Sequence, residues 1–182
     1  YSNFIIEDYN LFPKVYWKNK NLQNTWIPIW IHWVEDIKSD NNENSKRNEK
    51  EAESIIRYLK EILQIMWDKI SIWIIAPFRN QVSYINDLIR KNKLEWYENV
   101  LVDTVHGFQW DEKDIILFST VYPNTKAYKF LNDVNLLNVA VSRARNSFLI
   151  FWDKQTIKNY KWENWEELLY TTLIRYIESL NK

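Results

Sequence analysis

The stretch Asp103-Thr-Val-His-Gly-Phe-Gln-Trp-Asp-Glu112 leads into the apolar run Ile115-Ile-Leu-Phe-Ser119, and this junction decides how the chain is interpreted. A purely structural connection between two strand-like runs needs only turn residues. This one carries several polar groups that can bind ligands. Because open α/β sheets bind ligands beyond the carboxyl ends of their strands, the first of these groups are expected at such an edge. The groups belong to Thr104, His106, Gln109 and Glu112.

A second informative segment is Asn138-Val-Ala-Val-Ser-Arg143-Ala-Arg145. It belongs to an apolar run whose spacing predicts a helix over Leu136–Ala144, with two guanidinium groups at its end. Arginine suits phosphoryl charge because its planar fork stays charged and binds oxyanions bidentately. The alternative, which is stronger for Arg145 than for Arg143, is a cation that the helix macrodipole favours at a helix end.

Strand-like and helical patterns alternate along the chain, which predicts a mostly parallel sheet with helices on both faces. Asn48 is predicted to cap a helix that continues to Met66, with Glu51 completing a capping box. Asp36–Lys46 is polar and is expected to form an exposed flexible loop. The predicted strands are Ile27–Val34, Ile70–Ala76, Val100–Val102, Ile115–Thr120 and Ser147–Phe151, and the further predicted helices are Gln81–Arg90, Leu136–Ala144 and Trp165–Leu180.

The two polar segments together resemble motifs V and VI of superfamily 1 helicases, in the 5′→3′ subfamily that includes the RNA-surveillance and Okazaki-maturation helicases. The resemblance extends from about Ser2 to about Asp153. It includes Ala76-Pro-Phe-Arg-Asn-Gln81, which is similar to the family's T-P-Y-x-x-Q element, although Ala76 and Phe78 replace its two hydroxyl residues. The resemblance implies that residues 1–182 form one C-terminal RecA-like domain, a three-layer α/β fold.

The resemblance also implies roles in ATP hydrolysis. Arg143 corresponds to the finger that reaches the γ-phosphate of ATP held by the first RecA-like domain. Glu112 corresponds to a residue that contacts the nucleotide, and Gln109 to one that couples nucleotide state to the nucleic-acid track. Arg145 is a further candidate for contact with the nucleotide.

Single-stranded DNA or RNA is the partner that the resemblance implies. The positions of Thr104 and His106 lie near the nucleic acid in the family, as does the strand end that carries Arg79 and Gln81. For His106 the competing interpretation is a hydrogen-bonded structural histidine, and for Phe78 it is a place in the core.

The sequence contains no G-x-x-x-x-G-K-[ST] phosphate loop and no D-E-x-x box before the T-P-Y-x-x-Q-like element. In helicases these elements hold ATP and Mg²⁺, and they belong to the first RecA-like domain. The chain begins at Tyr1 rather than Met, so we expect a fragment with that domain upstream. We therefore predict that this chain alone does not hydrolyse ATP. Two alternatives remain: a non-catalytic module that binds nucleic acid or protein, and, more weakly supported, a small-molecule enzyme.

Composition restricts the function classes further. Lysine plus arginine equal aspartate plus glutamate at 24 each, so nucleic-acid binding has to come from local patches rather than net charge. The absence of cysteine excludes disulfides, thiolate metal sites and a cysteine nucleophile. No apolar run reaches the roughly 18 residues of a membrane span, so we expect a cytoplasmic protein with no membrane partner.

The chain has one glycine, Gly107, and 11 tryptophans. Several tryptophans stand where the helicase family has glycine, or at turn-like positions where glycine is usual. We hypothesise that the gene uses UGA for glycine; the alternative is a genuinely tryptophan-rich chain, which UGG codons would establish. If the indoles are real and the backbone there is left-handed, each site costs about 1–2 kcal/mol. The positions in question are Trp17, Trp26, Trp30, Trp67, Trp73, Trp96, Trp110 and Trp152.

Overall fold

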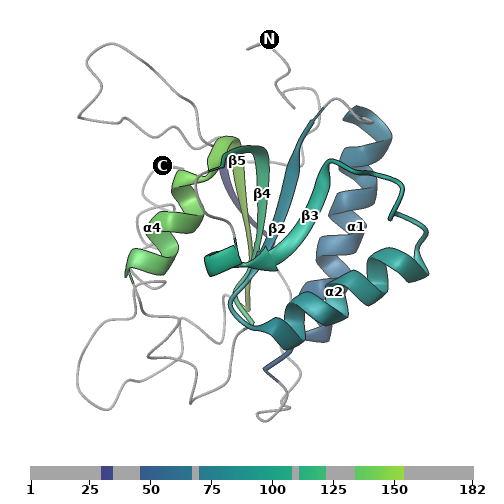
Figure 1. Ribbon diagram of the computed structural model, residues 1–182, viewed down its shortest axis with the longest axis horizontal. Coiled ribbons are helices and arrows are strands. Elements are labelled where there is room, and N and C mark those ends of the chain that lie inside the picture. Colours follow the sequence, from purple (N-terminus) through teal and green to yellow (C-terminus); the bar gives the residue numbers. More distant parts are fainter. Residues whose placement is uncertain (1–29, 35–45, 67–69, 108–110, 122–133, 154–182) are drawn as a thin grey trace.

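A five-stranded parallel sheet forms the centre of the protein (Figure 1). The computed structural model describes residues 30–34, 46–66, 70–107, 111–121 and 134–153. In order across the sheet, the strands are β1-β5-β4-β2-β3, and every neighbouring pair is parallel. Their bounds are β1 Trp30–Val34, β2 Ile72–Ala76, β3 Val100–Thr104, β4 Lys113–Ser119 and β5 Ala144–Phe151.

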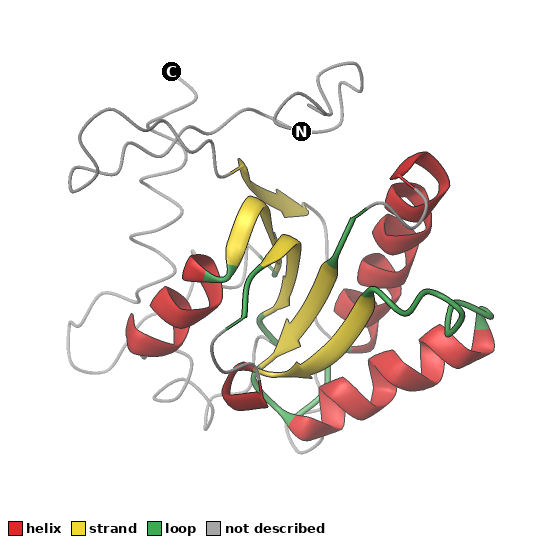
Figure 2. Cartoon of the chain, turned by 45° about the horizontal axis from the view of Figure 1, so that its top comes forward, coloured by secondary structure: helices red, strands yellow, loops and turns green. Residues whose placement is uncertain are grey.

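Helices cover both faces of this sheet. Figure 1 shows α1 (Glu49–Met66) and α2 (Arg79–Lys91) on one side and α4 (Val134–Ser142) on the other. The short 3₁₀ helix η1 (Val105–Gly107) follows β3 directly. In Figure 2 the helices (red) flank the strands (yellow) as separate layers. This arrangement confirms the predicted three-layer α/β fold with a parallel sheet.

The start of α1 follows from its capping residue. The side-chain Oδ1 of Asn48 accepts a hydrogen bond of 3.0 Å from the backbone N of Glu51, and Asn48 Nδ2 donates to Glu51 Oε1 at 3.1 Å. An asparagine in this position satisfies a backbone N–H that has no partner within the helix. The predicted cap at Asn48 is therefore confirmed.

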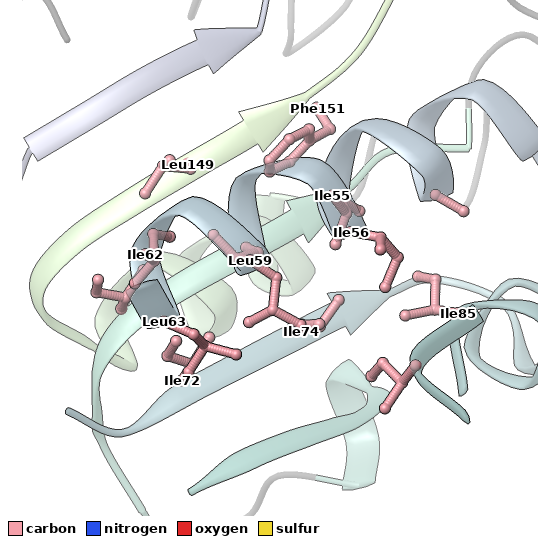
Figure 3. Packing of buried hydrophobic residues seen from close by; sticks show 14 of the residues in the cluster. Ile55, Ile56, Leu59, Ile62, Leu63, Ile72, Ile74, Ile85, Leu149 and Phe151 are labelled. Atoms are coloured by element: carbon pink, nitrogen blue, oxygen red, sulfur yellow. The ribbon is translucent and has the colours of Figure 1, made fainter. Parts of the chain in front are cut away.

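The core between α1, α2 and the sheet is built from alternate strand residues (Figure 3). On β2, Ile72 and Ile74 point to this side, as do Leu149 and Phe151 on β5. The apolar stripe of α1 packs against them because residues three and four apart share one helix face. Its members are Ala52, Ile55, Ile56, Leu59, Ile62 and Leu63, each at most 5% exposed.

The opposite face of the sheet carries the intervening side chains. Trp73 on β2 pairs in register with Ile116 on β4, and both are buried. Phe118 and Phe148 stack with their ring centroids 5.7 Å apart. Burial on both faces explains why β2 reads as a continuous apolar run, as the sequence predicted.

The structure corrects the predicted end of the motif VI helix. The α4 helix ends at Ser142, and Ala144 already belongs to β5, where it pairs with Lys113. Arg143 occupies the turn between them, and its carbonyl accepts a 2.9 Å hydrogen bond from Lys113 N. Arg145 therefore lies on a strand, and the helix macrodipole does not account for it.

The described tryptophans do not have left-handed backbones. Among the described non-glycine residues, positive φ occurs at Lys46, Lys93 and Val121. Trp73 and Trp152 are at most 2% exposed. The left-handed strain considered above therefore does not arise at Trp30, Trp73, Trp96 and Trp152, while Trp17, Trp26, Trp67 and Trp110 lie outside the described residues.

Three further predictions fall wholly or mostly outside the described residues. They are the loop Asp36–Lys46, of which only Lys46 is described, the helix Trp165–Leu180, and the first part of the strand Ile27–Val34.

Candidate nucleotide and nucleic-acid sites

The amino edge of the sheet brings motif V and motif VI residues together. Because β4 and β5 are parallel neighbours with Lys113 opposite Ala144, the residues just before Lys113 lie beside those around Ala144. The backbone hydrogen bond from Lys113 N to Arg143 O fixes this register. Glu112, Arg143 and Arg145 are therefore neighbours, although more than thirty positions separate the first from the last.

Arg143 is half-buried in this group. Its Nη1 makes a long contact of 3.5 Å with the backbone O of Asp111. Its Nε is buried and has no hydrogen-bond partner among the described residues. A guanidinium that is positioned by the fold but incompletely paired is able to bind an added oxyanion.

Arg145 and Glu112 form a loose ion pair next to it. Arg145 Nε lies 3.5 Å from Glu112 Oε2, and the two side chains are 53% and 56% exposed. Exposed pairs of this kind contribute only about 0–1 kcal/mol, so both side chains can exchange this contact for a ligand at little energetic cost. Gln109, the other candidate for nucleotide contact, lies outside the described residues.

Lys113 is a cation at this edge that the sequence reasoning did not select. Its Nζ lies 2.6 Å from Asp111 Oδ2 and 5.1 Å from the ring centroid of Trp73. The hydrogen bond from Lys113 is the main reason that the pKa of Asp111 is lowered. The only feature of the sequence that points to Lys113 is that it directly follows the two carboxylate residues Asp111 and Glu112.

The candidates for nucleic-acid contact lie at the opposite, carboxyl edge. Thr104 is the last residue of β3 and pairs with Ala76 at the end of β2. Thr104 is only 9% exposed, and its backbone N donates to Asp103 Oδ1 at 2.6 Å. His106 is exposed in η1, and Arg79 is exposed in the first turn of α2. Three of the four predicted residues thus reach the same edge with some exposed surface.

Gln81 does not fit the predicted direct contact, because its side chain is completely buried. Its Oε1 accepts from Asn48 N at 2.8 Å, and its Nε2 donates to Asn48 O at 2.9 Å and to Ser119 Oγ at 3.1 Å. These three bonds occupy the amide group, so Gln81 joins α1, α2 and β4 instead of facing a ligand.

Glu51 is the buried centre of this edge, and the sequence suggested only its capping role. It is inaccessible to solvent and accepts hydrogen bonds from Ser119 Oγ, Val121 N and Thr120 Oγ1. Desolvation by burial raises the pKa of Glu51 to about 8, although these hydrogen bonds act in the opposite direction. The N-x-x-E spacing locates the carboxylate, but nothing local indicates its remote partners.

The sole glycine lies at the same edge. A Cβ added to Gly107 would come within 2.1 Å of Asp103 Oδ2 and 2.3 Å of Asp103 Cγ. A side chain at position 107 would therefore require the Asp103 carboxylate to move away.

No helix among the described residues is both long enough and apolar enough to cross a membrane.

A family model described as an AAA domain matches residues 1–155 of the chain. An uncharacterized ATP-dependent helicase of Methanocaldococcus jannaschii is 29% identical over 157 residues, which cover 86% of this chain and 21% of the relative. Helicase sen1 of Schizosaccharomyces pombe is 36% identical over 125 residues, or 64% of this chain and 7% of the relative. Regulator of nonsense transcripts 1 of Dictyostelium discoideum is 32% identical over 114 residues, which cover 60% of this chain and 8% of the relative. The chain thus spans about a fifth or less of the lengths of these relatives.

Proposed function

From the premise that this chain belongs to the AAA-domain family and is the C-terminal RecA-like domain of a superfamily 1 helicase, we propose that it is the second motor domain of an ATP-dependent helicase or translocase. In this proposal residues 1–182 form one domain, and a first RecA-like domain precedes it in the complete protein. The observation that carries the proposal is the group formed by Glu112, Arg143 and Arg145 at the amino edge of the sheet.

Arg143 acts in this proposal as the finger that stabilises charge on the γ-phosphate of ATP. Its half-buried guanidinium, with a buried Nε that lacks a partner among the described residues, suits an oxyanion delivered from outside the domain. Such arginines contribute several orders of magnitude to the rate in other nucleoside triphosphatases. Mg²⁺ would be held by the first domain and would supply charge neutralisation between the phosphates.

Glu112 and Arg145 serve as further contacts to the nucleotide, together with Gln109. The ion pair between Glu112 and Arg145 opens as ATP enters, since its 3.5 Å geometry and half-exposed side chains hold it weakly. Lys113 keeps Asp111 in place beside Arg143.

The carboxyl edge forms part of the track for single-stranded DNA or RNA. Arg79 and His106 are the exposed groups that reach the phosphates or bases, and the Thr104 side chain contributes from the end of β3. ATP-driven closure and opening of the two domains then moves these contacts along the strand. We place this activity in the cytoplasm.

The test is an Arg143→Ala substitution in the full-length protein. ATP turnover is expected to fall by at least a hundredfold, because the transition-state charge loses its partner. The dissociation constant for a single-stranded oligonucleotide is expected to stay within threefold, since Arg143 lies at the other edge of the sheet. Arg90→Ala is the matched control, because Arg90 is an exposed arginine at the end of α2 that pairs with Asp87.

Unchanged turnover in Arg143→Ala contradicts the finger assignment. A full-length protein that binds single-stranded nucleic acid but shows no ATP turnover points instead to a non-catalytic binding module. Parallel titrations with DNA and RNA oligonucleotides of the same sequence determine which of the two is preferred.

A further inference from the structure

The turn that follows β4 holds an unfavourable backbone. Val121 has φ of 54° and is 3% exposed. A β-branched residue in the left-handed region is a genuine outlier, because its Cβ substituents crowd the backbone. Such conformations persist only where the surroundings fix them, and they cluster at functional sites. The turn Ser119–Val121 therefore needs an external restraint.

Glu51 supplies that restraint from the first turn of α1. Its Oε2 accepts from Val121 N at 2.8 Å and from Ser119 Oγ at 2.6 Å, and its Oε1 accepts from Thr120 Oγ1 at 3.2 Å. One carboxyl group thus contacts three consecutive residues. A second restraint on the turn is the 3.2 Å bond from Thr120 N to Phe151 O at the end of β5.

The same contacts continue to α2. Ser119 Oγ donates to Glu51 while it accepts from Gln81 Nε2 at 3.1 Å, and Gln81 is bound on its other side to the backbone of Asn48. Gln81 and Arg79 share the first turn of α2. The buried chain Glu51–Ser119–Gln81 therefore connects the start of α1 and the end of β4 to the turn that carries the exposed Arg79.

Stability alone is a poor explanation for a carboxyl group at this place. Burial of an ionisable group carries a desolvation penalty, and an apolar side chain of similar volume usually packs at least as well. What a carboxyl group adds is directional hydrogen bonding to several backbone and side-chain donors at once. Here those donors belong to the elements that end at the carboxyl edge.

We propose that Glu51 is a positioning residue for nucleic-acid binding, which holds the turn Ser119–Val121 and the first turn of α2 in the arrangement that presents Arg79 to the strand. This inference rests on the proposed function, since it deepens the account of the nucleic-acid edge. It does not involve Glu112, Arg143 and Arg145 at the amino edge of the sheet.

The test compares Glu51→Leu with Glu51→Gln in the full-length protein. The oligonucleotide concentration for half-maximal ATPase stimulation is expected to rise at least tenfold in Glu51→Leu, with the turnover at saturating oligonucleotide within twofold of wild type. Glu51→Gln keeps a carbonyl oxygen for Ser119 and Val121, so it is expected to stay within threefold on both measures. Glu53→Gln, an exposed glutamate on the same helix, is the matched control.

Hydrogen exchange at the Val121 amide gives a second readout. It is expected to speed up at least tenfold in Glu51→Leu and to stay near wild type in Glu51→Gln. If Glu51→Leu does not fold, Ser119→Ala replaces it, because that variant breaks the link between Glu51 and Gln81 and leaves the carboxyl group in place. Ser119→Ala is expected to raise the half-maximal oligonucleotide concentration at least threefold.

Several outcomes overturn the inference. A folded Glu51→Leu protein with wild-type oligonucleotide dependence would falsify it, and so would a loss in turnover alone. A Glu51→Gln variant as defective as Glu51→Leu also contradicts it. A wild-type protein that neither binds single-stranded nucleic acid nor responds to it in its ATPase refutes the proposed function itself, which separates that failure from this one.

Discussion

Gly107 shows how one residue type follows from its surroundings. Its own φ is not positive, so backbone conformation does not require glycine there. The constraint comes from Asp103, whose carboxylate fills the space of a side chain at position 107, accepts a bond from Thr104 N, and would have to move if position 107 carried a side chain. The sequence suggests a turn residue at this position but gives no sign of the close approach.

A Gly107→Val substitution is expected to displace the Asp103 side chain and to destabilise the domain by about 1–3 kcal/mol. The measurement is the free energy of unfolding from urea titration, with nucleic-acid affinity determined on the same samples. Asp103→Ala in the Gly107→Val background is expected to recover part of the loss, because it removes the atoms that clash. No recovery in the double variant speaks against this account.

At the scale of elements, the apolar runs predicted the strands well because two-sided burial demands nearly continuous hydrophobicity, as in β2. The capping pair Asn48 and Glu51 placed the start of α1 for a similarly local reason. The end of α4 was misjudged because neither glycine nor proline marks it. The helix stops where Lys113, from a distant segment, takes the carbonyl of Arg143.

In the candidate site, too, local sequence patterns were informative, and contacts with distant residues were not visible in the sequence. Glu112 and Arg143 were selected because their motifs resemble those of a known family, and the parallel register makes them neighbours. Gln81 was misassigned because its amide is satisfied by Asn48 and Ser119, which lie 33 and 38 positions away. Polar residues with remote partners look exposed in a sequence, and that is why the network around Glu51 was missed.

The buried Glu51 carboxyl, which joins α1 to the end of β4, should make the free energy of unfolding depend on pH. Burial raises the pKa of Glu51 in the folded state to about 8, above its ordinary value of 4.5. Between these two pKa values the folded state therefore binds more protons than the unfolded state. The contribution of Glu51 to stability is complete below pH 4.5 and is lost as the pH rises toward about 8. Among the described residues, the groups that hydrogen-bond its carboxyl include the Asn48 amide, the Ser119 and Thr120 hydroxyls and the backbone N–H groups of Thr120 and Val121, none of which carries a charge.

The free energy of unfolding is expected to fall between pH values of about 5 and 8, by at most roughly 1.4 kcal/mol per pH unit. Chemical unfolding followed by tryptophan fluorescence measures this slope. In Glu51→Gln the slope is expected to be shallower, whereas Glu53→Gln is expected to keep the wild-type slope. Equal slopes in wild type and Glu51→Gln rule out Glu51 as the titrating group.

At the scale of the whole molecule, the two groups of candidate residues lie at opposite edges of one sheet. The proposed role of Arg143 as a finger places its target on another domain, and no phosphate-loop motif occurs in the 182 residues. The isolated chain is therefore expected to show no ATP turnover above a no-protein blank, with Mg²⁺ and oligonucleotide present. The full-length protein measured in parallel is the positive control, and turnover by the isolated chain that Arg143→Ala abolishes contradicts the prediction.

In the proposed motor, the parallel sheet also limits how force is transmitted. Strands β2, β4 and β5 are packed on both faces, and at about 3.3 Å per residue they separate the two edges by on the order of 20 Å. A close-packed slab of this kind does not shorten or shear appreciably under load. In the proposed motor, a small tilt at the nucleotide-binding edge is therefore transmitted undiminished to the nucleic-acid edge, so the step length is set by how far the whole domain rotates.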